Sequence, residues 1–254
     1  MKKCETCGAD YKINENIPNF LPKSMQEKIK YIPNCNCYET ALKRELEENE
    51  KKMQVERLKN KIKKFKDISI VDSKFDKSTF EKADMSDEHI KFCKNFSERF
   101  ISRGQAPKGL LLHGTVGTGK TYASACVANE LMNSGKTVLV MQLGLYLNKL
   151  QREWAEAEKE VLKQVAECDL LVIDDFGAEK VSEFVIEKTF NLIDTRYRAE
   201  KPIIITSNLN LKQIENKFTE RVADRISEMC ILYAVKGESK RKNIKNDEFL
   251  KFIA

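Results

Sequence analysis

The sequence predicts an α/β fold in which a parallel sheet is flanked by helices and follows a small N-terminal region of different composition. Two observations support this prediction. Short apolar runs alternate with helical patterns from residue 86 onward, and this alternation is typical of a parallel sheet with helices on both faces. The first 66 residues lack the alternation and contain half of the eight cysteines. We therefore expect two regions that are stabilised in different ways.

Five apolar runs are the candidate strands of the sheet: Gly109–His113, Thr137–Met141, Asp169–Ile173, Ile203–Thr206 and Cys230–Val235. Helical patterns at residues 120–133, 143–168, 182–199 and 211–229 separate them. Another helix is expected from Ser86, a suitable N-cap, to about Arg103. Residues 67–84 contain Phe75 and Phe80 and predict an irregular arm. Residues 67–254 are thus the predicted main domain.

Composition excludes several protein classes. Of the 254 residues, 41% are hydrophobic and 33% are charged, which is enough apolar material for a core and excludes disordered and collagen-like chains. No apolar run approaches the roughly 18–20 residues that cross a bilayer, and the N-terminus lacks the apolar segment of a secretory signal. We expect a cytoplasmic protein without a membrane partner. The net charge of +6 permits contact with nucleic acid without demonstrating it.

Residues 39–66 are rich in Glu, Lys, Arg and Leu and contain neither Gly nor Pro. Leu42, Leu46, Asn49 and Met53 recur at spacings of three and four, which predicts one long amphipathic helix. Its lysines between residues 59 and 66 are interpreted as a solvated face, with contact to nucleic acid or a partner as the alternative. The segment is expected to link a module of residues 1–38 to the main domain.

Residues 1–38 contain too few apolar side chains to form a core, but they contain two cysteine pairs. Cys4 and Cys7 form a C-x-x-C pair, and Cys35 and Cys37 form a C-x-C pair. Four thiolates suit tetrahedral Zn²⁺, and Gly8 supplies the tight turn of a zinc knuckle. The metal would also supply folding energy that the segment lacks. Unliganded surface thiols are the alternative, and a redox pair is disfavoured because no βαβ unit surrounds it.

The strongest motif follows the first candidate strand. Residues 114–121 read GTVGTGKT, a full match to G-x-x-x-x-G-K-[ST] between a strand and a helix. The glycines let successive N–H groups face a polyphosphate, and the helix N-terminus adds the positive end of its dipole. Lys120 supplies charge for the β- and γ-phosphates of ATP, and the Thr121 hydroxyl can ligate Mg²⁺. The predicted nucleotide-binding residues are Gly114, Thr115, Val116, Gly117, Thr118, Gly119, Lys120, Thr121 and Tyr122.

Two further candidate strands run into polar residues that suit the same site. The strand at 169–173 leads to Asp174 and Asp175. Asp174 would hold Mg²⁺ through its water shell, and Asp175 would orient or deprotonate the attacking water. The strand at 203–206 leads to Ser207 and Asn208, which would emerge beside the γ-phosphate at the carboxyl edge of the sheet. For Asn208, an ordinary turn is an equal alternative.

Six sequence blocks together resemble the AAA+ ATPases of the DnaC/DnaI helicase-loader and IstB-like family. They are GTVGTGKT at 114–121, DLLVIDDFG at 169–177, DTRY at 194–197, PIIITSNL at 202–209, ERVADRI at 220–226 and GESKR at 237–241. The blocks follow one another in the order found in the family. The resemblance implies a five-stranded ASCE-type P-loop sheet, ATP bound at subunit interfaces, and contact with single-stranded DNA in an assembled oligomer.

The resemblance also implies roles for single residues. Asn208 matches the sensor-1 position, and Arg241 matches sensor 2. Arg225 matches the arginine finger that reaches the ATP of the neighbouring subunit, with Arg221 as a nearby alternative. One departure is Asp175, since many AAA+ proteins have Glu at this position. The shorter side chain leaves open whether the protein hydrolyses ATP or uses it as a switch.

The main functional hypothesis is an ATP-dependent replication factor that loads a replicative DNA helicase onto single-stranded DNA. In this hypothesis, the cysteine-rich module and the helix at 39–66 hold the helicase. A transposition helper ATPase of the IstB type is the first alternative, and it shares the same catalytic blocks. An ATP-binding adaptor with little hydrolysis is the second. A metabolite kinase is the weakest, because it offers no reason for the Arg225 and Arg241 motifs.

Overall fold

The computed structural model describes residues 3–69 and 73–240. Within it the chain forms two compact units, Met1–Leu58 and Lys59–Ala254. Among the described residues, no helix is long and apolar enough to span a bilayer.

The N-terminal unit is small and contains little buried surface. It comprises β1 (Tyr11–Ile13), α1 (Lys23–Lys28), β2 (Tyr31–Pro33) and most of α2 (Cys37–Ile68). β1 and β2 pair in antiparallel orientation, and no residue of β1, α1 or β2 is buried. The helix expected at 39–66 is α2, and its apolar side chains Leu42, Leu46 and Met53 are exposed. Hydrophobic burial is therefore too small to hold this unit together by itself.

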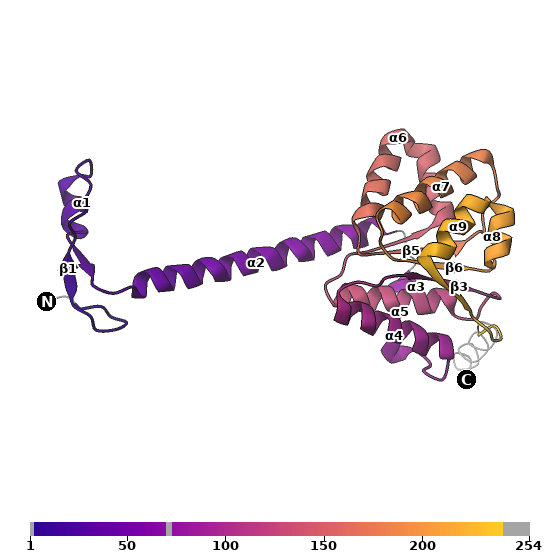
Figure 1. The fold of residues 1–254 in the computed structure, drawn as a ribbon, viewed down its shortest axis with the longest axis horizontal. Helices are drawn as coiled ribbons and strands as arrows, with labels where there is room; N and C mark the ends of the chain where they lie inside the picture. The colour runs from indigo at the N-terminus through magenta and orange to yellow at the C-terminus, as the bar shows by residue number, and fades with distance from the viewer. Residues whose placement is uncertain (1–2, 70–72, 241–254) are drawn as a thin grey trace, which may run out of the picture. The chain divides into compact units, whose positions relative to one another are not determined.

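The C-terminal unit contains a five-stranded sheet, shown in Figure 1 with helices on both of its faces. The strands are β3 (Gly109–His113), β4 (Val138–Gln142), β5 (Leu170–Phe176), β6 (Ile203–Ser207) and β7 (Cys230–Ala234). They are all parallel and follow the order β4-β5-β6-β3-β7. The predicted α/β fold with a five-stranded parallel sheet is confirmed.

The helices form two layers. α4 (Glu88–Arg103) and α5 (Lys120–Asn133) cover one face, while α6 (Leu143–Glu167), α7 (Glu183–Arg198), α8 (Leu211–Lys217) and α9 (Glu220–Met229) cover the other. The strands show why both layers are needed. Leu110 and Leu112 belong to the core under α4 and α5, whereas Leu111 belongs to the core under α6–α9. Successive side chains of a strand point to opposite faces, so a continuous apolar run requires cover on both sides.

β3 and β6 approach one another closely at one point. A Cβ atom added to Gly109 would lie 1.8 Å from the carbonyl oxygen of Ile203. Glycine is therefore required here by the spacing of the two backbones. β3 and β6 are also the strands that lead to the glycine-rich loop and to Asn208.

Three predicted segments differ from the structure in detail. The helix expected at 211–229 is two helices, because the Thr219 side chain accepts a hydrogen bond from Val222 N–H and starts α9 anew. α4 begins after Asp87, while Ser86 donates to the Asp84 carboxylate. The arm expected at 67–84 contains α3 (Ser73–Asp76) and the 3₁₀ turn η1 (Phe80–Lys82).

This arm is fastened to the glycine-rich-loop helix. Asn129 of α5 donates to the carbonyl oxygens of Phe75 and Ser78, both at 2.8 Å. The rings of Phe75 and Phe80 are buried beneath α4 and α5. Two backbone acceptors and two buried rings thus give a segment with little regular structure a fixed position.

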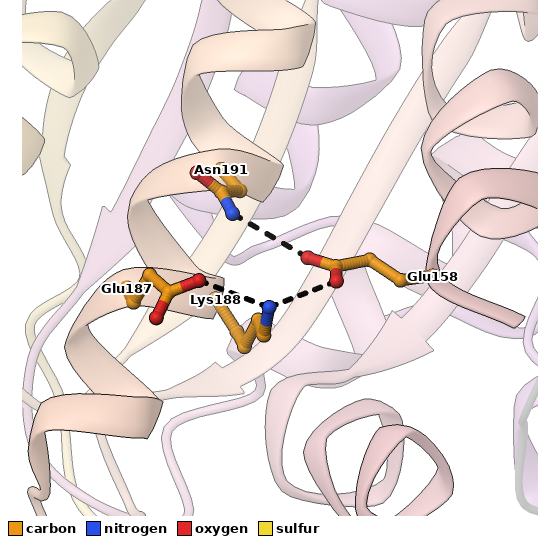
Figure 2. Close-up of polar contacts among 4 residues, drawn as sticks. All are labelled: Glu158, Glu187, Lys188 and Asn191. Atoms are coloured by element: carbon orange, nitrogen blue, oxygen red, sulfur yellow. Dashed lines mark hydrogen bonds and ion pairs between the residues drawn. The ribbon is translucent and has the colours of Figure 1, made fainter. Parts of the chain in front are cut away.

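Two polar clusters fix α7. The fully buried Arg196 donates to the carbonyl oxygens of Val165, Cys168, Asp169 and Pro202 at 2.6–3.1 Å. It therefore joins the segment between α6 and β5 to the residue that precedes β6. The second cluster, shown in Figure 2, joins α7 to α6. There the Lys188 ammonium lies 2.9 Å from the Glu158 carboxylate, which also accepts a hydrogen bond from Asn191.

Candidate nucleotide site and cysteine cluster

The glycine-rich loop connects β3 to α5 at the carboxyl edge of the sheet. Gly114, Gly117 and Gly119 have φ angles of 145°, 85° and 95°, which side chains with a Cβ rarely adopt. A Cβ on Gly114 would also lie 2.3 Å from the carbonyl oxygen of Val235. α5 begins at Lys120 directly after the loop, so its unpaired N–H groups are available to an anion.

Lys120 is buried, and its ammonium lies inside the curve of the loop. It donates to the carbonyl oxygens of Gly114 at 2.9 Å and Thr115 at 2.7 Å, and to Asn208 Oδ1 at 3.0 Å. The contact with Asn208 joins residues 88 positions apart in the sequence. The predicted phosphate-binding lysine and the predicted sensor are therefore direct neighbours. An ammonium that donates to neutral oxygens can exchange one of them for a phosphate.

Asp174 lies near the end of β5 and is 6% exposed. Burial raises the pKa of its carboxyl group, and hydrogen bonds with the Thr206 and Thr121 hydroxyls oppose the rise. Thr206 donates to Asp174 Oδ1 at 2.6 Å. The arrangement brings Asp174 beside Thr121 of the P-loop. A hydroxyl and a carboxylate are hard oxygen ligands of the kind that Mg²⁺ prefers.

Asp175 has an unusual backbone. Its φ is 53°, and the register of β5 against β6 shifts between Ile173 and Phe176. Thr206 Oγ1 accepts a hydrogen bond from Asp175 N–H at 3.0 Å, and the Asp175 side chain is exposed. Irregular strands of this kind redirect a side chain at the rim of a sheet. The two carboxylates thus differ, one buried and bonded and the other facing solvent.

The chain after β7 lies against the loop. Lys240 N–H donates to the Gly117 carbonyl oxygen at 3.0 Å, and the Lys240 ammonium pairs with Asp87. Asp87, His89, Thr118 and residues 236–240 surround a cavity of about 240 Å³ beside the loop. Burial lowers the pKa of His89, so the imidazole is neutral at neutral pH. The predicted sensor-2 residue Arg241 lies outside the described residues.

The two arginines of α9 have different surroundings. The Arg225 guanidinium lies 2.7 Å from the Asp194 carboxylate of α7 and packs over the rings of Phe190 and Tyr197. Arg221, one turn earlier, is exposed. Within one chain, Arg225 therefore joins α9 to α7, and neither arginine lies among the P-loop contacts described above.

The four N-terminal cysteines form one cluster, in which the sulfur atoms lie within 4.8 Å of one another. The Cys4 carbonyl oxygen accepts a hydrogen bond from Gly8 N–H at 2.8 Å, and Gly8 has a φ of 74°, as a knuckle turn requires. Backbone hydrogen bonds from Cys7 and Thr6 lower the pKa of Cys4 to about 6, whereas hydrogen bonds with Cys7 and Cys35 raise the pKa of Cys37 to about 12. Four clustered thiols fit a tetrahedral Zn²⁺ ion, which would ligate all four as thiolates.

Several residues of these sites were not found by sequence reasoning. The sequence predicts Thr206 only as the end of a strand, although a polar residue after three isoleucines is a signal that could have identified it. His89 and Asp87 lie about thirty residues before the P-loop lysine and belong to no motif of it. Arg196 stands inside a recognised block, but nothing in the sequence showed that its side chain would be buried.

Several known proteins are similar to this chain. The chain is 24% identical to the replicative helicase loader DnaI of Bacillus subtilis (strain 168), over 94% of this chain and 79% of that protein. It is 29% identical to the replicative helicase loader DnaC of Escherichia coli (strain K12), but over only 46% of this chain and about half of that protein. A crystal structure of DnaI superposes with a TM-score of 0.58 at 24% identity, covering 66% of this chain and 96% of that one.

The family comparison covers most of the chain. Residues 24–248 match the family described as IstB-like ATP binding protein. The fold, the order of the motifs and the DnaI and DnaC relatives agree with this match. The chain therefore belongs to the family of IstB-like ATP binding proteins, and it is an AAA+ protein of the DnaC/DnaI type.

Proposed function

We propose that the protein binds ATP with Mg²⁺ and loads a replicative DNA helicase onto single-stranded DNA. The contact between Lys120 and Asn208 carries the proposal, because it joins the P-loop to the polar residue after β6. A γ-phosphate that reaches Lys120 would meet Asn208 at the same point. Family membership supports ATP as the ligand, and the relatives named helicase loaders support the biological role.

The described side chains divide the chemistry between them. Thr121 and Asp174 would hold Mg²⁺, which neutralises phosphate charge in the transition state. Thr206 keeps Asp174 in place. Asp175, whose carboxylate faces solvent, would orient the attacking water. Lys120 would bind the β- and γ-phosphates, and the loop amides would surround them.

The hydrolytic site is completed by a second copy of the chain. We assign the arginine finger to Arg225, as the resemblance implies, with Arg221 as the alternative. The two assignments require different events: Arg225 must exchange the Asp194 carboxylate for a phosphate, whereas the exposed Arg221 needs no such exchange. Both predict that an isolated chain binds ATP and hydrolyses it slowly.

The N-terminal unit distinguishes a helicase loader from a transposition helper. The match to DnaI spans 94% of this chain and therefore includes the N-terminal part. We propose that the cluster of Cys4, Cys7, Cys35 and Cys37 holds one Zn²⁺ and that this unit, with α2, binds the helicase. A protein with these partners acts in the cytoplasm, as the sequence predicts.

The decisive experiment measures ATP affinity and ATPase rate for single variants and mixtures. Lys120→Ala should lose ATP binding and stay folded. Arg225→Ala should keep ATP affinity and lose turnover by about 10³-fold or more, which is the scale of an arginine finger. A mixture of the two variants should regain activity, because an intact loop on one chain then faces an intact arginine on the other. Single-stranded DNA should raise the wild-type rate, less so in high salt.

The variants of α9 separate the possible outcomes. If Arg221→Ala loses turnover while Arg225→Ala mainly lowers stability, the finger is Arg221. Normal turnover in both variants would contradict a site shared between chains.

One observation favours a second function, an ATP-dependent adaptor: Asp175 has a shorter side chain than the usual Glu, and its backbone is strained. A wild-type rate that stays at background with helicase and DNA present, while ATP still alters helicase affinity, would favour the adaptor.

A further inference from the structure

Residues 177–182 connect β5 to α7 and begin two residues after Asp175. We call this segment the β5–α7 connection. The Glu179 side chain folds back over it, and Glu179 Oε2 accepts a hydrogen bond from Gly177 N–H at 3.1 Å. Glu179 lies outside the six sequence blocks and has no part in the site as described so far.

The peptide groups of Gly177 are bonded on both sides by long side chains. Gly177 is buried, so its N–H and carbonyl groups need partners within the protein. Glu179 accepts from the N–H, and the Lys217 ammonium of α8 donates to the carbonyl oxygen at 2.6 Å. The Glu179 side chain is itself partly covered by α6, since a Cβ on Gly144 would lie 3.7 Å from Glu179 Cγ. Glu179 is therefore held in one place beside the connection.

The β5–α7 connection is also bonded to the chain that follows β6. Ser207 Oγ donates to the Phe176 carbonyl oxygen at 2.6 Å and accepts a hydrogen bond from Leu209 N–H at 3.0 Å. A Cβ on Gly177 would lie 2.7 Å from Leu209 Cδ1, so the two segments are in close contact. Asn208 lies between Ser207 and Leu209. A shift of the connection would therefore be felt at Asn208 as well.

Asp175 needs this support because its backbone is strained. Its φ of 53° is rare for a residue with a Cβ and persists only where the surrounding structure maintains it. Burial raises the pKa of Glu179, hydrogen bonds from its own N–H and from Gly177 N–H lower it, and the nearby charge of Asp175 raises it. Since like charges repel, Glu179 favours conformations in which the Asp175 carboxylate points away from the connection and into solvent, as observed.

We propose that Glu179 is a positioning residue for ATP hydrolysis, which holds the Asp175 carboxylate in place through Gly177 N–H. The inference rests on the proposed function, in which Asp175 orients the attacking water. A side chain one methylene shorter than Glu has less reach, so the position of its backbone decides where the carboxylate lies. Misplacement of a catalytic group by about 1 Å can cost about 10²-fold in rate.

The test measures ATP turnover and ATP affinity of the full-length protein with single-stranded DNA present. Glu179→Ala should lower kcat by about tenfold or more and leave the Kd for ATP unchanged, because only the group that orients water has moved. Glu179→Gln keeps an acceptor for Gly177 N–H and should stay within about twofold of the wild-type kcat. The matched control is Glu183→Ala, which removes an exposed carboxylate from the first turn of α7 and should change neither quantity.

Amide exchange at Gly177 gives a readout that does not depend on turnover. It should be about fivefold faster in Glu179→Ala than in the wild type or Glu179→Gln, the effect of one lost hydrogen bond. Faster exchange with a normal kcat would overturn the proposal, and so would a Glu179→Gln variant as slow as Glu179→Ala. Parallel losses of ATP affinity and kcat would also overturn it, because they indicate a purely structural role. Wild-type turnover at background level would instead contradict the proposed ATP hydrolysis itself.

Discussion

The two units of the chain are stabilised in opposite ways. In the C-terminal unit, β3 to β6 are buried almost completely between two helical layers. In the N-terminal unit, β1, α1 and β2 bury no residue, and four sulfur atoms lie together instead. The comparison teaches that the C-terminal unit depends on apolar packing, whereas the N-terminal unit has almost none and would depend on the Zn²⁺ that we propose for its cysteines.

The largest effect is expected at the cysteine cluster. Cys37→Ser, or removal of Zn²⁺ by a chelator, should unfold the N-terminal unit, because apparent zinc-binding energies of roughly 10–16 kcal/mol replace a core in comparable peptides. The melting of the C-terminal unit should stay the same. Amide exchange at β1 and β2, together with elemental analysis, measures both effects. Zn²⁺ should restore protection after chelation and Mg²⁺ should not. Equal exchange with and without metal would remove the contrast between the units.

The next effect is expected at Arg196, a fully buried cation of the C-terminal unit. Arg196→Met keeps most of the side-chain volume but leaves several buried carbonyl groups without a donor, so we expect a loss of about 3–5 kcal/mol in unfolding free energy. Denaturant unfolding measures it. Arg198→Met is the matched control, since Arg198 lies on the same helix and its side chain is 76% exposed. A similar loss in both variants would mean that burial of Arg196 is not what matters.

The buried Asp174 carboxylate should lower the folding stability of the ligand-free protein. Its folded-state pKa is raised above the ordinary 3.8, so the folded protein binds this proton more tightly than the unfolded one. Stability without ligand should therefore fall as the pH rises from about 3.8 through the raised value. Asp174→Asn removes that fall and should make the ligand-free protein more stable than the wild type at pH 7.5. Urea unfolding at pH 4 and pH 7.5 tests this, and a variant less stable than wild type at pH 7.5 would contradict it.

The smallest effect is expected in the α6–α7 cluster of Figure 2. Glu158→Gln should cost about 0.5–1 kcal/mol, because the Lys188–Glu158 pair is mostly covered. Glu158 and Glu187 raise the pKa of Lys188 above the ordinary 10.5, so the pair contributes fully below that pH and is lost as the pH rises through the raised value. The matched control is Glu215→Gln in the more exposed Lys212–Glu215 pair, for which we expect almost no change. Equal effects would show that cover adds nothing here.

The sequence predicted most of the sheet because strands that are buried on both faces appear as continuous apolar runs. The runs around Leu111, Val140 and Ile204 are apolar at every position, and each lies in a strand. The P-loop could also be recognised from the sequence, because the backbone shape of the loop requires its glycines and the charge of a phosphate requires Lys120. The cysteine pairs predicted a cluster, because the cysteines of a metal site are often separated by only a few residues in the sequence.

Other features depend on contacts between distant segments, which no local pattern records. The break between α8 and α9 depends on the cap at Thr219, in a stretch whose pattern suits one continuous helix. Thr206 meets Asp174 only because β6 lies beside β5, and His89 lies beside Thr118 of the loop only because of where α4 packs. The pairing of Arg225 with Asp194 likewise required the packing of α9 on α7.

The missing side chain at Gly109 limits which sequences this fold can accept. Its backbone lies against Ile203 so closely that a single methyl group would separate β3 from β6. Those two strands lead to Lys120 and Asn208, whose side chains meet at 3.0 Å. A substitution five residues before the loop would therefore act on phosphate binding without touching any phosphate-binding residue. Among relatives that still bind ATP in this way, selection should have kept glycine here as strictly as it keeps the lysine.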